Sequence, residues 1–478
     1  MSRYAGMIGS AGVVLVALAG CGESVSKTER ELAVAPDASR DVQPRPAQPE
    51  TASEPAASEV AVASSPAEAT ADATTDAPAS AAVRFVPSMS GMPKGGMWKC
   101  DPVLVDINGD GALDLASIAR KGFGPSVWFN DGKGNWTDAS NGLTSTTGTR
   151  SCGGGLALGD ANGDGNLDLI VADHCQGVYV YLGDGNGTWS CAVSALFAEE
   201  VVRDPELSQQ FVGAEDLDVG DVNGDGHLDI VSASSDRAGL SVWIGDGTGT
   251  NWTWQPNSLP RDGWSNRVVL EDINQDGALD IITSYSRGPR VYLNDGTGQW
   301  SDGSEGLPSP RTHGIYHGVA IHDINNDGRL DIAVANWIDG PEVHLQNADG
   351  TWTKMPDVFP DMFGGAVGIA VGPLDADAHP DLIVTGRLTQ EGGTSRGVFY
   401  LAGNGDGTFR HITDSDLPGE GLLAMTGATV GDIDGDSVAD VVACSGLHVE
   451  SRFGEASMPV IEERMLVWRT VRQAPKAD

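Results

Sequence analysis

A nine-residue phrase, Asp-x-Asn-Gly-Asp-Gly-x-x-Asp, recurs along the chain and limits its possible folds more than any other feature. The first copy runs from Asp106 to Asp114, and later copies carry a few substitutions. Successive copies start 50 to 61 residues apart, which is the spacing of a repeat architecture. The seven copies span residues 106–114, 160–168, 221–229, 272–280, 323–331, 373–381 and 432–440.

The side chains of this phrase are those of a hard-cation site. Oxygen atoms at its first, third, fifth and ninth positions, with a backbone carbonyl expected at the seventh, form the ring of ligands that Ca²⁺ prefers. The glycine at the sixth position allows the sharp turn that such a loop needs. An EF-hand would also carry a glutamate at the twelfth position. The twelfth residues of the six copies that begin with Asp are instead Ser117, Val171, Ser232, Thr283, Val334 and Ala443.

Six copies keep an oxygen-bearing side chain at all four ligand positions, so we expect about six bound Ca²⁺ ions. The sixth copy has Pro373 at its first position and Ala378 in place of the glycine, so we expect its site to be weak or empty, whereas the seventh has Ser437 but keeps four carboxylates. The alternative is a series of acidic Asp-Gly hairpin turns without metal. The repetition of four aligned ligand positions favours calcium. The expected ligands are Asp106, Asn108, Asp110, Asp114, Asp160, Asn162, Asp164, Asp168, Asp221, Asn223, Asp225, Asp229, Asp272, Asn274, Asp276, Asp280, Asp323, Asn325, Asp327, Asp331, Asp432, Asp434, Asp436 and Asp440.

Each repeat contains four short strand-like segments, of which one leads into the phrase and one leaves it. A third carries aromatic residues before a polar turn, and a fourth begins at Trp or Phe in most repeats. Seven such units predict an all-β, seven-bladed β-propeller over residues 83–472. A solenoid is the less suitable alternative, because it would need capping repeats with polar outer faces.

The last repeat has no fourth segment after the apolar run at residues 465–470. A spare strand-like run at residues 83–86 stands before the first repeat. We expect this N-terminal strand to pair with the last blade and close the ring. Closure would remove a sheet edge that otherwise favours aggregation.

Residues 1–20 resemble a targeting signal, with a positive start at Arg3 and an apolar run too short to span a bilayer. The quartet Leu-Ala-Gly-Cys that ends at Cys21 resembles the lipobox of bacterial lipoproteins. It implies a lipidated Cys21 and an exported protein anchored to the bacterial envelope, at the outer membrane or the cell surface. The alternative is an ordinary secretory signal with an incidental cysteine. Residues 21–82 have few large apolar side chains and are expected to form a disordered tether, and residues 473–478 a tail.

The formal net charge of −38 argues against nucleic acid or an anionic membrane surface as a partner. We therefore expect contact with a membrane only through the lipid on Cys21.

The phrase, the strand that contains Val-Tyr or Val-Trp, and the Gly-x-Trp/Phe-Thr step together resemble FG-GAP/VCBS-type repeats, the family that also forms the head of integrin α chains. The resemblance covers about residues 83–472. It implies a seven-bladed propeller with calcium hairpins on its bottom face and ligand contacts on its top face. The residues expected to contact a ligand there are Trp98, Trp264, Arg267, Tyr285, Arg287 and Trp337.

Two functions fit these residues. The first is a monomeric adhesion or interaction module for a glycan or a protein, because aromatic side chains beside Arg can stack on sugars and bond their hydroxyl groups. The alternative is a polysaccharide lyase or glycoside hydrolase that uses His313, Tyr316 and His317 as acid and base groups. The fold does not decide between them. The sequence contains no nucleophile elbow, zinc motif or phosphate loop, and the glycine run at 153–155 precedes a strand rather than a helix.

Five cysteines follow Cys21, and an odd number leaves at least one of them without a disulfide partner in an exported chain. Cys100 and Cys152 occupy nearby positions in adjacent repeats and are the preferred candidate pair. Cys444 lies in a predicted strand and is expected to be a small core residue.

Overall fold

The computed structural model describes the repeat region with short gaps, over residues 83–98, 101–121, 123–143, 153–174, 177–196, 213–234, 239–260, 265–285, 288–308, 316–356, 364–375, 377–390, 393–419, 427–445 and 465–472. The expected signal segment, Cys21, the tether and the C-terminal tail lie outside these residues. No helix in the described part of the chain is long and apolar enough to cross a membrane.

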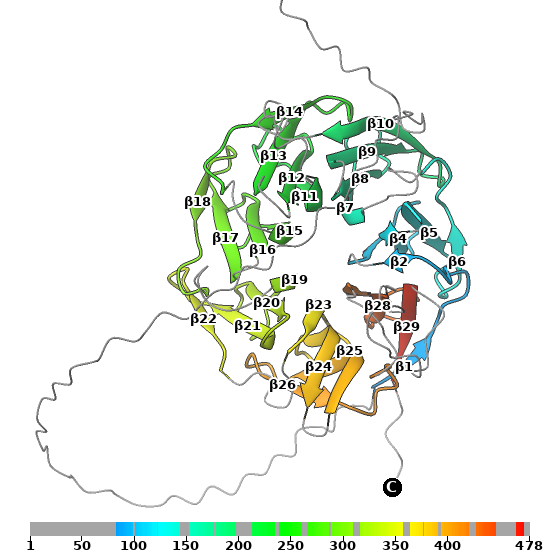
Figure 1. Cartoon of the computed structure of the whole chain (residues 1–478), viewed down its shortest axis with the longest axis vertical. Helices are drawn as coiled ribbons and strands as arrows, with labels where there is room; N and C mark the ends of the chain where they lie inside the picture. The colour runs from blue at the N-terminus through cyan, green and yellow to red at the C-terminus, as the bar shows by residue number, and fades with distance from the viewer. Residues whose placement is uncertain are drawn as a thin grey trace, which may run out of the picture. The chain divides into compact units, whose positions relative to one another are not determined.

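The described strands form seven antiparallel sheets, which Figure 1 shows as blades around a ring. In the first blade, each of the four strands pairs with the next, and Figure 1 shows the first strands of the following five blades nearest the centre of the ring. Its strands are β3 (Val103–Val105), β4 (Asp114–Lys121), β5 (Pro125–Asn130) and β6 (Trp136–Asp138), with the short β2 (Met97–Trp98) beside β4. The predicted all-β, seven-bladed propeller is confirmed.

The next five blades repeat this order. The second comprises β7 (Gly153–Gly159), β8 (Asp168–Asp173), β9 (Gly177–Gly183) and β10 (Trp189–Leu196). The third comprises β11 (Ala214–Gly220), β12 (Asp229–Ser234), β13 (Leu240–Gly245) and β14 (Trp252–Gln255). The fourth comprises β15 (Ser265–Glu271), β16 (Asp280–Tyr285), β17 (Gly288–Asn294) and β18 (Trp300–Asp302). The fifth comprises β19 (Tyr316–His322), β20 (Asp331–Asn336), β21 (Gly340–Gln346) and β22 (Trp352–Lys354). The sixth comprises β23 (Ala366–Gly372), β24 (Asp381–Gln390), β25 (Gly393–Gly403) and β26 (Phe409–Ile412).

The seventh blade takes its outer strand from the N-terminal segment. Its order is β27 (Ala428–Gly431), β28 (Asp440–Cys444), β29 (Met465–Arg472) and β1 (Val83–Pro87), and β1 pairs antiparallel with β29. Phe85 of β1 is buried, and its ring meets that of Tyr400 edge-on with the ring centroids 5.5 Å apart. Backbone hydrogen bonds between the two ends of the repeat region thus close the ring.

The hydrophobic core lies between the blades. Each of seven clusters of buried apolar side chains in the described residues joins two neighbouring blades. The cluster between blades 1 and 2, for example, brings Ile118 of β4 together with Leu169 and Val171 of β8. Second strands such as β8, β12 and β20 are buried along their whole length, because neighbouring blades cover both of their faces. This explains why a continuous apolar run follows each phrase.

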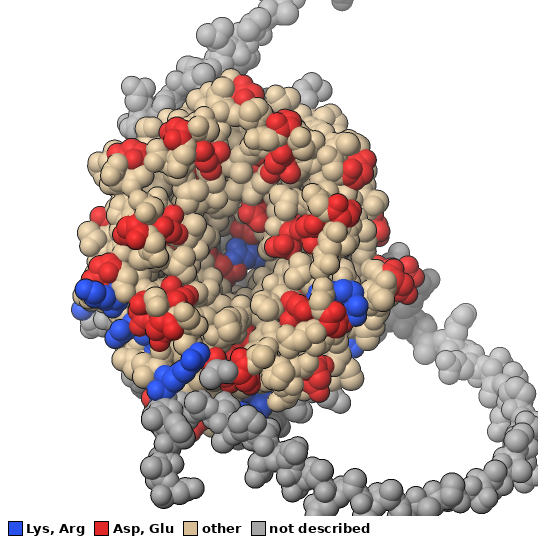
Figure 2. Space-filling model, turned by 180° about the vertical axis from the view of Figure 1, so that it is seen from behind, with Lys and Arg blue, Asp and Glu red and all other residues tan. Residues whose placement is uncertain are grey.

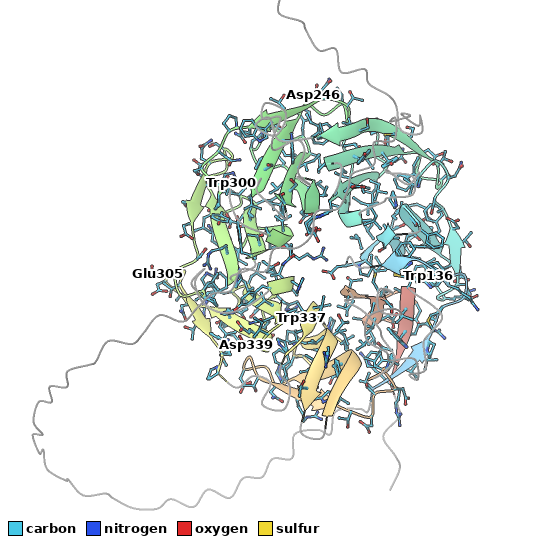
Figure 3. The ribbon with its side chains drawn as sticks, viewed as in Figure 1. Trp136, Asp246, Trp300, Glu305, Trp337 and Asp339 are labelled. Carbon is cyan, nitrogen blue, oxygen red and sulfur yellow. The ribbon has the colours of Figure 1, made fainter. Side chains whose placement is uncertain are left out.

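Tryptophans at the start of the fourth strands link neighbouring blades near the outer rim. The indole of Trp189 in β10 donates to the carbonyl oxygen of Ala139 in blade 1, with 2.9 Å between the two atoms. Trp136 in β6 donates in the same way to the carbonyl oxygen of Ser88, next to β1, at 3.1 Å. Figure 3 shows Trp136 and Trp300 at the outer side of the ring. The repeated aromatic residues are therefore structural.

The cysteines are only partly described. Cys444 in β28 is buried and is not part of a disulfide, as expected for a small core residue. Cys191 in β10 is disulfide-bonded. The predicted pair, Cys100 and Cys152, lies outside the described residues.

Deletion of residues 83–92 tests the seam between β1 and β29. The deletion removes the buried side chains of Phe85 and Met92, and loss of one buried Phe alone costs about 3–5 kcal/mol. We expect the melting temperature, followed by circular dichroism, to fall by at least about 5 °C. A chain that begins at residue 83 is the matched control and should melt like the full chain. Equal melting of the two shortened proteins would contradict the role of the seam.

Candidate functional site

Each phrase forms a loop between the first and second strands of its blade, and the ninth-position aspartate anchors that loop. In the first loop, Asp114 is fully buried at the start of β4. Its Oδ2 accepts from the backbone N–H of Ile107 within the loop at 3.0 Å, and its Oδ1 accepts from that of Asn130 in the third strand at 2.8 Å. One carboxylate thus joins the loop to the end of β5.

Side-chain oxygens at the other ligand positions accept hydrogen bonds from backbone N–H groups of the loop and so hold its turn. Asp106 Oδ1 accepts from the backbone N–H groups of Gly109 and Asp110, at 2.8 and 3.1 Å, and Asp106 Oδ2 accepts from Gly111 at 2.9 Å. The amide of Asn108 donates to Asp110 Oδ2 at 3.0 Å. The first five loops repeat the third-to-fifth contact, so their candidate ligands share one arrangement.

The backbone of these loops is left-handed at the fourth and sixth positions, with φ of 72° at Gly109 and 90° at Gly111. Residues other than glycine also adopt positive φ there: Gln275 (61°), Asn326 (59°) and Ser437 (67°). Such conformations cost about 1–3 kcal/mol for residues with a Cβ and cluster at functional sites. Ala378, at the sixth position of the sixth loop, is not among the described residues with positive φ, so this loop lacks the left-handed residue that the others have at that position.

Burial raises the pKa of the ninth-position aspartates from the ordinary value of 3.8. The pKa is about 6 for Asp114, Asp168, Asp229, Asp280 and Asp331, and about 7 for Asp381 and Asp440. Neighbouring loop carboxylates add to this effect, although backbone N–H groups oppose it. A cation beside these side chains would favour their charged forms.

The seventh loop gives the most direct test of fit to a metal ion. Asp432, Asp434 and Asp440 each offer a carboxylate oxygen, and these oxygens lie within 4.8 Å of one another. Asp434 Oδ1 is buried and has no hydrogen-bond partner. A set of converging carboxylates with an unpaired oxygen fits a hard divalent cation such as Ca²⁺.

The opposite face is formed by turns between the second and third strands, and it carries the predicted ligand contacts. Trp264, Arg287 and His313 lie outside the described residues.

Trp98 has no exposed surface, because its ring packs on Phe123 and Trp128 and its indole donates to the carbonyl oxygen of Gly95. The expected ligand contact by Trp98 is therefore wrong in this structure, in which the side chain is part of the core. Tyr285, at the end of β16, is half-buried.

Arg267 lies at the centre of the ring rather than on an open surface. Its guanidinium pairs with Asp101, which precedes blade 1, and with Asp216 of blade 3, whose Oδ1 lies 3.0 Å from Nη1. Because blades 4 and 1 are not neighbours, this ion pair spans the middle of the ring. Figure 2 shows both acidic and basic side chains inside the central hollow. The expected ligand contact by Arg267 stays a prediction, and in this structure its guanidinium joins these two carboxylates.

Two acidic side chains of β11 also cap the inner edge of β15. Asp216 Oδ2 accepts from the backbone N–H of Val268 at 2.9 Å, and Asp218 Oδ2 accepts from that of Leu270 at 2.8 Å. A Cβ added at Gly155 would collide with Asp216 Oδ1, which gives the glycine run in β7 a packing role. Sequence reasoning missed these carboxylates, although their alternation in a strand next to the centre was a detectable signal.

Tyr316 is also buried, which contradicts its expected use as an acid or base. Its hydroxyl donates to Glu342 Oε2 at 3.2 Å, and Glu342 Oε1 lies 2.8 Å from Lys354 Nζ. Burial opposes the charged form of Glu342, but hydrogen bonds from His344 and Lys354 outweigh it and lower its pKa to about 2. Burial beside this carboxylate raises the pKa of Tyr316 well above its usual range. The phenol is therefore a fixed donor.

Trp337, a predicted contact residue that the structure describes, lies at the turn between β20 and β21. It is half-buried between β20 and β21, and the ring of His317 meets it edge-on with the centroids 6.2 Å apart. Asn336 Oδ1 accepts from the N–H of Ile338 at 2.9 Å, which fixes the turn. Ile338 is 47% exposed, and Asp339 beside it is exposed. Figure 3 marks the positions of Trp337 and Asp339 on this part of blade 5.

Comparisons with known proteins agree with the repeat pattern. The family described as FG-GAP-like repeat matches residues 106–171, 221–283, 272–334 and 323–384. Cartilage acidic protein 1 of Mus musculus is 28% identical over 187 residues, which is 37% of this chain and 28% of that protein. The chain therefore matches less than a third of this relative's length.

Two solved structures show distant likeness. One is a lectin of Agrocybe aegerita, described by its recognition of non-reducing terminal N-acetylglucosamine, with 20% identity, a TM-score of 0.45 and coverage of 67% of this chain and 81% of that chain. The other is BBS1N in complex with ARL6DN, with 12% identity, a TM-score of 0.48 and coverage of 82% and 98%. At these TM-scores, neither likeness carries an argument about function.

The raised pKa values predict how stability depends on pH when calcium is chelated. The folded-state pKa values of about 6 to 7 lie above the ordinary 3.8, so the folded protein binds more protons between pH 4 and 7. The free energy of unfolding in EDTA should therefore fall as pH rises through this range. In saturating Ca²⁺ the fall should be smaller. The part that remains comes from carboxyls outside the expected metal sites, namely Asp216, Asp218 and Asp381 of the sixth loop, whose pKa values burial also raises.

Urea titrations at several pH values, with EDTA and with Ca²⁺, measure this difference. The pH profile in EDTA is the reference for the profile in Ca²⁺, since both are measured on the same protein. Parallel profiles in the two conditions would contradict metal binding by these carboxylates.

Proposed function

Because this chain is a seven-bladed β-propeller that carries FG-GAP-like repeats, we propose that it is an exported, calcium-stabilised interaction module. Its ligand is a glycan or a protein, bound on the face opposite the metal loops. The single observation that carries this proposal is the fixed, accessible turn at Trp337 and Ile338.

The distribution of exposed apolar side chains supports a binding role for that face. Among the described residues, the exposed large hydrophobic side chains are Val86, Phe123, Ile338 and Val471. Val86 and Val471 lie in the strands of the seam, whereas Phe123 and Ile338 lie at turns between second and third strands. Adjacent apolar side chains at a surface mark interaction sites better than scattered ones do, and half-buried Trp337 and exposed Ile338 are adjacent at one turn.

Calcium has a structural role in this proposal. The ring of oxygen ligands in loops one to five and seven would hold about six ions, while the sixth loop has Pro373 in place of its first ligand and Ala378 in place of its glycine. A bound Ca²⁺ would neutralise carboxylates that repel one another and would fix the loop conformation. The metal loops would then keep the blades in register while the opposite face binds the ligand.

The enzymatic alternative is the weaker of the two. Tyr316 is buried and donates to Glu342, so it cannot reach a polymer, and His317 has Trp337 beside it. His313, the third residue of that scheme, lies outside the described residues. A lyase or hydrolase on this face would therefore need other groups.

Binding and chain-length assays on a panel of cell-wall and algal polysaccharides separate the two functions. We expect the chain to bind one class of glycan, or an envelope protein tested in a parallel binding assay, and to shorten no polymer. Trp337→Ala and Ile338→Ala should weaken binding by about tenfold or more, as for residues at the centre of an interface. Val471→Ala is the matched control, because Val471 is 43% exposed but lies in the seam. Shortening of a polymer by the wild type would instead establish an enzyme.

Anchoring through Cys21 is a separate part of the proposal. Its support is the lipobox-like quartet in the sequence. Replacement of Cys21 by Ala should move the protein from the membrane fraction to the soluble fraction of cells, because no lipid can then be attached. Unchanged partitioning of the variant on immunoblots would refute lipid anchoring and leave the propeller's binding role untouched.

A further inference from the structure

Arg469 occupies a position that is apolar in every other blade. Thr470 follows it and donates its backbone N–H to Asp440 Oδ1 at 2.6 Å, as Asn130 does to Asp114 in blade 1. This shared contact aligns Arg469 with one residue in each of the other third strands. Those residues are Phe129, Leu182, Ile244, Leu293, Leu345 and Ala402.

The same blade differs at the third ligand position. The first five loops have Asn there, and its amide donates to the fifth-position aspartate at 2.9 to 3.0 Å. The seventh loop has Asp434, which has no amide hydrogen to donate to Asp436. This loop therefore places four carboxylates together, which repel one another without a positive charge nearby.

Arg469 supplies a positive charge from the ring-closing strand. Its Nη1 donates to Asp434 Oδ2 at 3.4 Å, while Asp434 Oδ1 is buried and has no donor. Asp434 also contributes an oxygen to the group formed with Asp432 and Asp440. One oxygen of Asp434 thus contacts Arg469, and the other is left for a different partner.

Two other loops meet the problem of excess charge in different ways. The sixth loop also has an aspartate at its third position, Asp375, but Pro373 removes a carboxylate, and the Tyr400 hydroxyl donates to Asp375 at 3.4 Å. The fifth loop pairs Arg329 with Asp327, but Arg329 lies within the loop itself. Arg472 of β29 also reaches the sixth loop, but it donates to the backbone carbonyl oxygen of Asp375 at 3.4 Å, whereas Arg469 donates to a ligand carboxylate of the seventh.

We propose that Asp434 is shared between Ca²⁺ and Arg469, whose guanidinium offsets the extra negative charge of the seventh metal loop. The inference rests on the proposed binding of calcium by the loops. Arg469 lies opposite Val86 of β1 in the seam, so the same side chain connects the seventh metal loop to the strand pair that closes the ring. Because this guanidinium is a positive charge beside the site, it lowers the affinity of the loop for Ca²⁺, and it reduces repulsion among the four carboxylates when no ion is bound.

Exchange of two residues for their counterparts in other blades tests this arrangement. Asp434→Asn restores the side chain of loops one to five, and Arg469→Leu restores the residue of blades 2, 4 and 5. Asp434→Asn alone leaves a guanidinium beside the metal and should raise the Ca²⁺ concentration needed for half-occupancy by about tenfold. Arg469→Leu alone leaves four carboxylates and should lower it. The double variant should return to within about threefold of the wild type, because its charges match those of the other loops.

Hydrogen–deuterium exchange of the full chain at increasing free Ca²⁺ gives the occupancy of each loop. Peptides that cover residues 432–440 report the seventh loop, and peptides that cover 106–114 are the internal control and should not shift. Without Ca²⁺, the peptides that cover residues 432–440 should be less protected in Arg469→Leu than in the wild type and in Arg469→Lys, because the four carboxylates then repel one another without a nearby positive charge. A simple packing role for Arg469 predicts instead that Arg469→Leu needs more Ca²⁺ than the wild type.

Three results would overturn the inference. One is a double variant that binds as weakly as Asp434→Asn. Another is an Arg469→Leu variant that needs more Ca²⁺ than the wild type while the first loop is unchanged. The third is a lack of Ca²⁺-dependent protection in every loop of the wild type, which would also refute the proposed calcium binding. The first two would leave calcium binding intact, so the two failures are distinguishable.

Discussion

The buried aspartate at the ninth position of each phrase is the interaction on which the propeller depends. It recurs once per blade, and in each blade one of its oxygens accepts a backbone N–H from the third strand. Its burial makes ionisation costly, as the raised pKa values express. A charged aspartate in this place needs partners, and the loop provides backbone donors on one side and converging ligand oxygens on the other. The proposed calcium sites and the blade geometry are therefore two consequences of one buried carboxylate.

The rest of the structure follows from how the blades meet. Their apolar contacts lie between neighbouring blades, so no single blade has a complete core of its own. The pairing of β1 with β29 completes the last of these interfaces. At the centre, Arg267 of blade 4 forms ion pairs with Asp101, which precedes blade 1, and with Asp216 of blade 3. The blades are thus joined by the β1–β29 pairing at the seam, by tryptophan hydrogen bonds at the rim and by the ion pairs of Arg267 at the centre. These contacts do not depend on the turns opposite the metal loops, so the sequences of those turns can vary.

The sequence predicted the fold well because its signals repeat. Seven aligned phrases identify the loops, and the apolar runs after them identify buried second strands, so errors in one repeat are corrected by the others. The candidate contact residues were predicted less well, since each occurs once. Trp98 and Tyr316 have residue types typical of binding sites, yet packing against Phe123 and a hydrogen bond to Glu342 place both in the interior. Nothing in the local sequence of either residue specifies a partner from another segment. The pairing of Arg469 with Asp434 likewise became visible only when the strands were aligned by their hydrogen bonds.

The proposed role of the loops depends on calcium binding, and the number of Ca²⁺ ions bound per chain is the most direct measurement of it. The full chain would be stripped with EDTA, dialysed against buffered Ca²⁺ and assayed for bound metal by atomic emission. We predict about six bound ions per chain. Replacement of Asp114 by Asn should remove about one ion, since each loop supplies its own ligands. Binding of one ion or none per chain would contradict this prediction, and the phrase would then be an acidic turn that serves the backbone alone.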